Sequence, residues 1–172
     1  MWRQMNDPRD QLGDLYRQHG RSIWAYAASQ VNGPHEADEI LQETFLAAAQ
    51  DLESLRSAKS QKAWLIGIAR NISRDRRRKL IRSRGSSLVE EPACREMPDE
   101  DPRLDRMRQA IARLPDTHRE ALELRLACDL SYAETAEALG IPIGTVRSRL
   151  HDAVLRIREL VGVANESPTG AQ

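Results

Sequence analysis

Hydrophobic residues in the first half of the chain recur at steps of three and four, the spacing of one face of an α-helix. Gly33 and Pro34 interrupt this pattern and indicate a turn. The tract before the turn contains Leu12, Leu15, Tyr16, His19, Ile23, Tyr26 and Ala27. The tract after it contains Ala37, Ile40, Leu41, Thr44, Phe45 and Ala48. We expect one helix for each tract.

A third helical tract runs from about Gln61 to Arg82, after the polar segment RSAKSQ, which we expect to be a loop. Its predicted inward face contains Trp64, Leu65, Ile68 and Ile72. The stretch GSSLVEEPACREMPDEDP follows, with three prolines and six acids against one arginine. Its composition is typical of a solvated segment without a core, so we expect a flexible acidic linker over 85–102.

Helical spacing resumes at Arg103 and is punctuated by the segments LPDT, DLS and GIPIG. The final segment NESPTGAQ is polar and is expected to be a disordered tail over 163–172. The alternation typical of strands is not found. We therefore predict an all-α fold with two small helical domains, 8–84 and 103–162, joined by the linker.

The second domain contains a predicted helix-turn-helix. Ser131 can cap a helix, and Glu134 stands three residues later, as in a capping box. Gly140 fits the left-handed position that ends a helix, and Pro142 cannot continue it. A second helix is expected to start near Ile143. Two helices joined by a tight glycine-containing turn are typical of this motif.

Winding the second helix at about 100° per residue separates two faces. The face expected to seat it contains Ile143, Val146, Leu150, Ala153 and Ile157, extended by Val154 and Leu160. The opposite face contains Ser148, His151, Asp152 and Leu155, with Arg147 at its margin. Arg149 winds to the side of the helix away from Arg147. In helix-turn-helix proteins the N-terminal end of the second helix meets base edges in the major groove. An ordinary helical hairpin with solvated arginines would show the same pattern, and this alternative stays open.

The third tract has a basic side opposite its apolar one, with Arg70, Arg74 and Arg77. Like charges four residues apart repel, so a stripe of one sign favours a polyanion as partner. The second tract instead exposes Asp38, Glu39, Gln42 and Glu43, which favour a basic or polar protein partner. A soluble helix with a charged face is the alternative reading of both.

Composition excludes several classes of function. Net charge is zero, so the totals alone do not indicate a nucleic-acid partner. The cysteines Cys94 and Cys128 form no CxxC pair, so we expect no disulfide framework, metal site or cofactor. The histidines are scattered and no catalytic motif is found, so we do not expect an enzyme. No signal peptide or membrane-spanning segment is predicted, which favours the cytoplasm and no membrane insertion.

The segments EADEILQETFLAAAQ, KAWLIGIARNISRDRRRK and LSYAETAEALGIPIGTVRSRLHDA together resemble the short, two-domain extracytoplasmic-function (ECF) type of the sigma-70 family of RNA polymerase sigma factors. The resemblance covers roughly Leu12 to Leu160. It implies a transcription initiation factor that binds core RNA polymerase, directs it to promoter DNA and helps open it. It also implies control by an anti-sigma factor.

The resemblance assigns roles to three sets of residues. Docking on the clamp coiled coil of the polymerase is implied for Asp38, Glu39, Gln42 and Glu43, and docking on the flap for the C-terminal domain. Contact with the −10 element is implied for Ser57, Lys59, Lys62, Trp64, Arg70, Asn71, Arg74, Arg77 and Arg78. Contact with the −35 element is implied for Gly144, Thr145, Arg147, Ser148, His151 and Asp152.

Some positions depart from the family pattern. Gln61 and Lys62 stand near a place where an aromatic residue is frequent, and Asp152 stands where arginine is common. Asp152 is thus where we expect this protein's own promoter preference. A stand-alone helix-turn-helix regulator with an N-terminal sensor or dimerisation domain is the alternative function.

Overall fold

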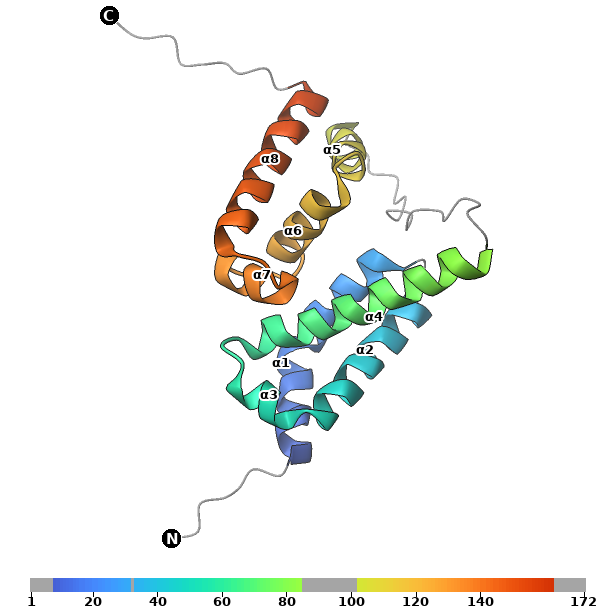
Figure 1. The fold of residues 1–172 in the computed structure, drawn as a ribbon. Helices are drawn as coiled ribbons and strands as arrows, with labels where there is room; N and C mark the ends of the chain where they lie inside the picture. Colours follow the sequence, from blue (N-terminus) through green and yellow to red (C-terminus); the bar gives the residue numbers. More distant parts are fainter. Residues whose placement is uncertain (1–7, 32, 85–101, 163–172) are drawn as a thin grey trace, which may run out of the picture.

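A computed structural model describes residues 8–31, 33–84 and 102–162, and this part of the chain contains helices and no strand (Figure 1). The predicted all-α fold is confirmed. The expected linker residues 85–101, with Cys94, and the expected tail 163–172 lie outside the described residues.

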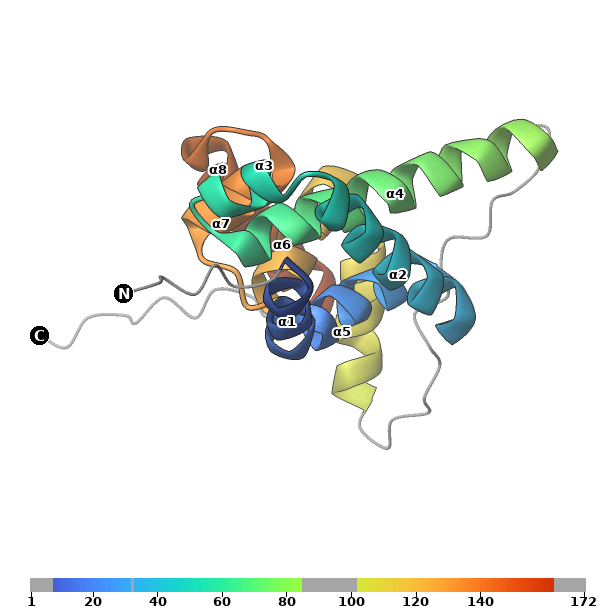
Figure 2. The same cartoon turned by 90° about the horizontal axis from the view of Figure 1, so that it is seen from below.

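The N-terminal unit consists of α1 (Pro8–Gln30), α2 (Pro34–Gln50), α3 (Leu52–Ser57) and α4 (Gln61–Arg84). Its core is formed by side chains without solvent exposure, among them Ile23, Ile40 and Leu55. The C-terminal half of α4 extends beyond the other helices (Figure 2). Helix α2 starts at Pro34, where proline is tolerated because the first helical N–H has no intrahelical acceptor.

The expectation that RSAKSQ is a loop was wrong for its first residues, because α3 continues to Ser57. Asp51 caps this helix by accepting a hydrogen bond from the Ser54 N–H at 3.1 Å, and Leu55 anchors it in the core. A helix of six residues contains too few turns to show a hydrophobic period, so the sequence pattern could not reveal it.

The buried face of α4 also differs from the prediction. Leu65 is buried as expected, but Trp64, Ile68 and Ile72 are half-buried. The fully buried positions include Ala63, Ile66 and Ala69. The helix is covered on two sides, since a Cβ placed on Gly67 would lie 3.5 Å from the Ala138 carbonyl oxygen of α7. A single amphipathic stripe therefore describes only one of its two contacts.

The C-terminal unit consists of α5 (Pro102–Ala112), α6 (Asp116–Leu126), α7 (Tyr132–Leu139) and α8 (Ile143–Val161). Helix α5 begins at Pro102, the residue at which we expected the linker to end.

The helix-turn-helix is confirmed in detail. Ser131 and Glu134 form a reciprocal capping box at the start of α7. Gly140 ends that helix at φ 65°, a left-handed conformation that glycine adopts without steric cost. Helix α8 then begins after Pro142, whose φ of −60° is fixed by its ring.

Helix α8 buries Val146, Leu150 and Ala153, as predicted. Three further positions that we expected on this face are solvent-exposed: Ile143, Val154 and Leu160, at 40%, 41% and 44%. Ile143 and Leu160 lie near the two ends of α8, and Val154 lies beside the buried Ala153.

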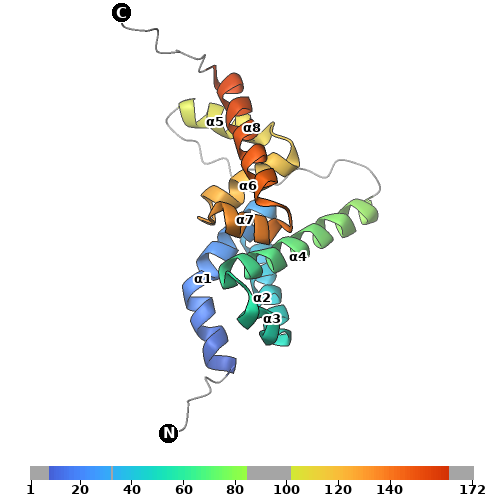
Figure 3. The same ribbon diagram turned by 60° about the vertical axis from the view of Figure 1, so that its left-hand side comes forward.

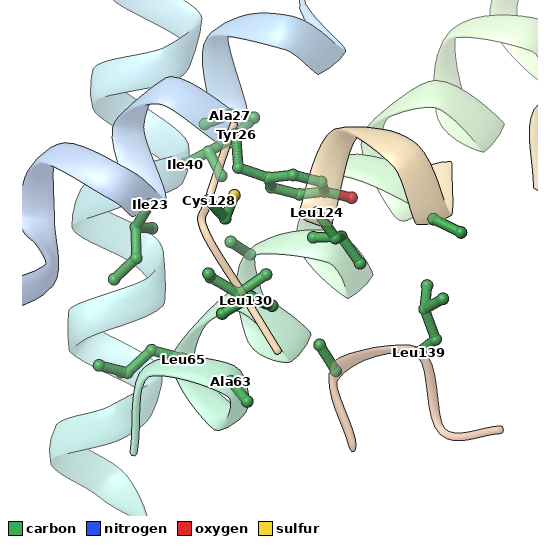
Figure 4. Close-up of a cluster of buried hydrophobic side chains, with 14 of the residues drawn as sticks. Ile23, Tyr26, Ala27, Ile40, Ala63, Leu65, Leu124, Cys128, Leu130 and Leu139 are labelled. Carbon is green, nitrogen blue, oxygen red and sulfur yellow. The ribbon is translucent and has the colours of Figure 1, made fainter. Parts of the chain in front are cut away.

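The two units are not separate bodies. Helices α6 and α7 lie between α8 and the N-terminal helices (Figure 3). Leu124, Cys128 and Leu130 of the C-terminal unit are fully buried in one continuous core with Ile23 and Tyr26 of α1 (Figure 4). The presence of two domains was predicted, but their contact was not.

Polar contacts surround this shared core. The Arg70 guanidinium contacts the Glu120 carboxylate at 2.6 Å. The Gln30 amide donates to Glu123 at 2.8 Å, and the Ser60 hydroxyl donates to Glu134 at 2.8 Å. Each of these hydrogen bonds joins one unit to the other.

Two groups at the interface are buried with few polar partners. Burial raises the pKa of the Cys128 thiol to about 11, so the thiol stays protonated and is a poor nucleophile. The Tyr26 hydroxyl is buried, and no hydrogen-bond partner for it is found among the described residues. Burial, and next the charge of Glu120, raise the pKa of Tyr26 well above its usual range.

Glu123 and Glu134 should show opposite pH dependence. Burial raises the pKa of Glu123, so its stabilising contribution is complete below the unfolded-state pKa and is lost as pH rises through the folded-state pKa. Hydrogen bonding from the Ser131 backbone lowers the pKa of Glu134, so its contribution is present above the unfolded-state pKa and is lost as pH falls.

We expect Glu123→Gln to raise the melting temperature near neutral pH and to change it little near pH 4. Glu134→Gln, the matched control at the same interface, should lower the melting temperature near neutral pH. Differential scanning fluorimetry of both variants across this pH range measures the effect. Shifts of the same sign for the two variants would contradict the assignment.

Candidate nucleic-acid and protein interfaces

The exposed face of α8 presents a compact set of polar side chains. Arg147, Ser148, His151 and Asp152 are all exposed, on the side of the helix opposite Val146 and Leu150. The Ser148 hydroxyl donates to the Thr145 carbonyl oxygen at 3.0 Å, so its lone pairs are left to accept a hydrogen bond from outside. The faces predicted for these four residues are therefore the observed ones.

The first turn of α8 is open to an anion. The first backbone N–H groups of a helix lack an intrahelical acceptor, and Pro142 provides no side-chain cap for them here. Apart from the adjoining stretch of α8 itself, no atom of the described residues lies within 4 Å of a Cβ placed on Gly144, so the backbone here can be approached closely. Thr145 is half-buried beside it. This end of the helix suits contact with a phosphate group.

Arg149 lies away from the exposed face of Ser148 and His151, as its winding predicted. It is half-buried and lines a cleft of about 1450 Å³ between the two units. Arg74, Arg77 and Arg108 also line this cleft, and so do carboxylates such as Glu123. The cleft is thus mixed in charge, with a basic majority.

The basic side of α4 is divided between solvent and the C-terminal unit. Asn71, Arg74 and Arg78 are exposed, and Arg77 is half-buried. Arg70 was expected on this side of the helix opposite the apolar face, but only 14% of its side chain is exposed. Arg70 donates two hydrogen bonds to Glu120, at 2.6 and 3.2 Å. The sequence pattern of α4 could not reveal a partner 50 residues away.

The segment before α4 is partly covered in the same way. Ser57 and Lys59 are exposed. The Lys62 ammonium instead lies 3.5 Å from the Asp129 carbonyl oxygen of the C-terminal unit. Trp64 is half-buried at the edge of the core. The residues expected to meet the −10 element are therefore not all accessible together in this conformation.

The acidic face of α2 is neutralised in part by an arginine that sequence reasoning missed. Arg76 contacts Glu39 at 2.7 Å and Glu43 at 2.6 Å, and its hydrogen bond lowers the pKa of Glu39. Asp38 accepts a hydrogen bond from the Trp24 indole N–H at 2.7 Å. Gln42 is exposed. The sequence signal that could have set Arg76 apart was its winding to a different side of α4 from Arg70 and Arg74. Its partners in α2 are seen only in the structure.

The structure also gives Asp152 a neighbour that the sequence did not suggest. A carboxylate oxygen of Asp152 lies 3.8 Å from the Nε2 atom of His118 in α6.

No group of histidine, cysteine or acidic side chains in the described ranges could hold a metal ion. Within the same ranges, no helix has the length and apolar character needed to cross a bilayer.

Sequence comparison identifies both units. The profile described as "Sigma-70 region 2" matches residues 15–83, and "Sigma-70, region 4" matches residues 104–157. The chain is 35% identical over 153 residues to the ECF RNA polymerase sigma factor SigL of Mycobacterium tuberculosis, covering 84% of this chain and 85% of that protein. It is 33% identical over 146 residues to the RNA polymerase sigma factor HrpL of Pseudomonas syringae pv. syringae, covering 80% and 79%.

Structure comparison agrees. The sigma factor RpoE of Bartonella quintana, solved in complex with the anti-sigma factor NepR, superimposes with a TM-score of 0.71. The match covers 91% of this chain and 99% of RpoE at 28% identity. With region 2 and region 4 placed on the two helical units described above, the chain belongs to the ECF type of the sigma-70 family of RNA polymerase sigma factors.

Proposed function

We propose that this chain binds core RNA polymerase and directs it to promoters with two spaced elements, assisting their melting. The observation that carries the proposal is the combination, in one chain, of an exposed Arg-Ser-His face on a helix-turn-helix with a second, arginine-rich helix in region 2. A single reading helix would suit many DNA-binding proteins. The two basic helices in separate units suit a factor that contacts two elements.

The −35 element is assigned to α8, with Gly144 and Thr145 near the backbone and Arg147, Ser148 and His151 at base edges. The geometry of the exposed helix start supports this assignment. Arginine can bind guanine through two hydrogen bonds.

The −10 element is assigned to the end of α3, the following loop and α4. Exposure of Ser57, Lys59 and Arg74 supports this assignment. Arg70 and Lys62 can join them only when region 4 leaves region 2, because both now contact residues of region 4. We therefore propose that the two units separate when the holoenzyme engages a promoter.

Protein partners follow from the acidic face of α2 and from region 4. We propose that Asp38, Glu39, Gln42 and Glu43 dock on the clamp coiled coil, and that region 4 docks on the flap. Because RpoE is found in complex with an anti-sigma factor, we also propose an inhibitory protein partner here. The factor would act where the polymerase is, in the cytoplasm, through binding and not through catalysis.

In-vitro transcription with core polymerase tests the proposed function. Core enzyme plus this protein should give promoter-specific transcripts from genomic fragments, and core enzyme alone should not. A gel-shift experiment without polymerase separates the alternative, because a stand-alone regulator binds its site alone. Tight, specific binding without core enzyme together with no specific transcripts would reject the proposal.

Arg147→Ala should weaken holoenzyme binding by about 1–3 kcal/mol and relax the preference at one −35 base pair. Arg74→Ala is the contrasting variant, because a phosphate contact acts through counterion release and should reduce the salt dependence on every sequence. Promoter-binding titrations at several salt concentrations measure both. If Arg147→Ala weakens all sequences equally, Arg147 contacts only phosphate.

Gly144→Ala should reduce −35 binding without lowering stability. The site is open in the free protein, and alanine favours a helix by about 1 kcal/mol over glycine, so the melting temperature should stay equal or rise. Gly140→Ala is the matched control in the same turn. Its φ of 65° strains any residue with a Cβ, so stability should fall. Melting curves and promoter binding of both variants are the measurements.

A further inference from the structure

Asp152 is an anomaly on the exposed face of α8. Between Ile143 and Arg158 it is the only acid, among Arg147, Arg149 and Arg156. Its side chain is 53% exposed and lies one helical turn beyond Ser148, on the same face. A carboxylate here would face the phosphates of any DNA bound to α8, and like charges repel.

The stability of the free protein gives no reason for this acid. Within the described ranges its ionic neighbour is His118, at 3.8 Å, a distance longer than a hydrogen bond. Pairs with a partner as exposed as Asp152 contribute little to folding. The hydrogen-bond donor that offsets the repulsion between the Asp152 carboxylate and the phosphates should therefore come from the DNA that α8 binds.

His118 is placed to orient the carboxylate. Its side chain is 17% exposed, between α6 and α8. The Thr117 hydroxyl lies 3.3 Å from the Nδ1 atom of the imidazole. If this hydroxyl donates, the neutral ring carries its proton on Nε2, the atom that faces Asp152. The ring then turns an N–H toward the carboxylate, and at 3.8 Å it attracts the carboxylate electrostatically without a hydrogen bond.

We propose that Asp152 selects cytosine at one base pair of the −35 element, and that His118 is the positioning residue that holds its carboxylate for this contact. The inference rests on the proposed function, because it needs α8 to lie in the major groove. It adds to that function the identity of one base and a residue outside the reading helix.

The choice of cytosine follows from hydrogen-bond chemistry. An ionised carboxylate only accepts, so guanine, with its O6 and N7 acceptors, and thymine, with O4, are disfavoured. Adenine has an N6 donor, but its N7 acceptor lies directly beside it. Cytosine presents the N4 donor without an acceptor of its own in the major groove. A single carboxylate is thus complementary to cytosine.

The experiment uses the complete holoenzyme. Wild-type holoenzyme first selects promoters from a randomised pool of duplexes, and each −35 base pair of the selected consensus is then varied in binding and transcription assays. We expect one position with a cytosine preference on the order of tenfold. Asp152→Ala should abolish the preference at that position alone. Asp152→Asn should shift it to adenine, because an amide can bind both N6 and N7.

Glu159→Ala is the matched control. Glu159 is an exposed acid on the same helix, so its removal changes the net charge equally but should leave base preference unchanged. His118→Ala should weaken the cytosine preference without changing the other positions, and His118→Gln, which retains an N–H donor, should restore part of it. Melting temperatures of all variants identify any general loss of folding, and the exposed site of Asp152 keeps its variants folded.

Three results would overturn the inference. Equal strengthening of binding to every sequence by Asp152→Ala and Glu159→Ala would show that Asp152 only repels phosphate. An unchanged cytosine preference in His118→Ala would remove the positioning role. Specific transcription without any cytosine preference at a position sensitive to Asp152 would reject the base contact while leaving the proposed function intact. Absence of specific transcripts from the wild-type holoenzyme would reject both.

Discussion

Leu124, Cys128 and Leu130 belong to region 4, yet they complete the core beside α1 and α4 of region 2. Apolar burial is the dominant favourable term in such contacts, and it is proportional to the area removed from water. The polar bonds around this core follow from it, because the packing brings Arg70 to Glu120 and Ser60 to Glu134. The position of region 4 on region 2 therefore determines which basic groups are presented to solvent.

Charge pairing offsets part of the repulsion among the arginines of α4. Arg76 is held by two carboxylates of α2, and Arg70 by one of α6. Arg74 and Arg78 remain exposed on the same helix. Helix α4 thus has three environments around its circumference: the region 2 core, the contact with region 4, and solvent.

Local sequence signals were sufficient where the determining contacts are themselves local. The capping box of Ser131 and Glu134, the left-handed Gly140 and the start of α8 at Ile143 were all predicted, since each depends on residues within a few positions. The engagement of Arg70 and the neighbour of Asp152 were not, because Glu120 and His118 are 50 and 34 positions away in sequence. Helix α3 was missed for the opposite reason, since it is too short to carry a period.

The buried Tyr26 hydroxyl gives the contact between the units a thermodynamic bias. A buried hydroxyl without a partner costs about 1–3 kcal/mol relative to one that is hydrated. Tyr26 has no hydrogen-bond partner among the described residues while its hydroxyl is buried beside region 4, and water can hydrate this hydroxyl once the units part. The docked state is thereby made less stable than its apolar area alone would make it, which lowers the free-energy cost of the separation of the two units that we propose.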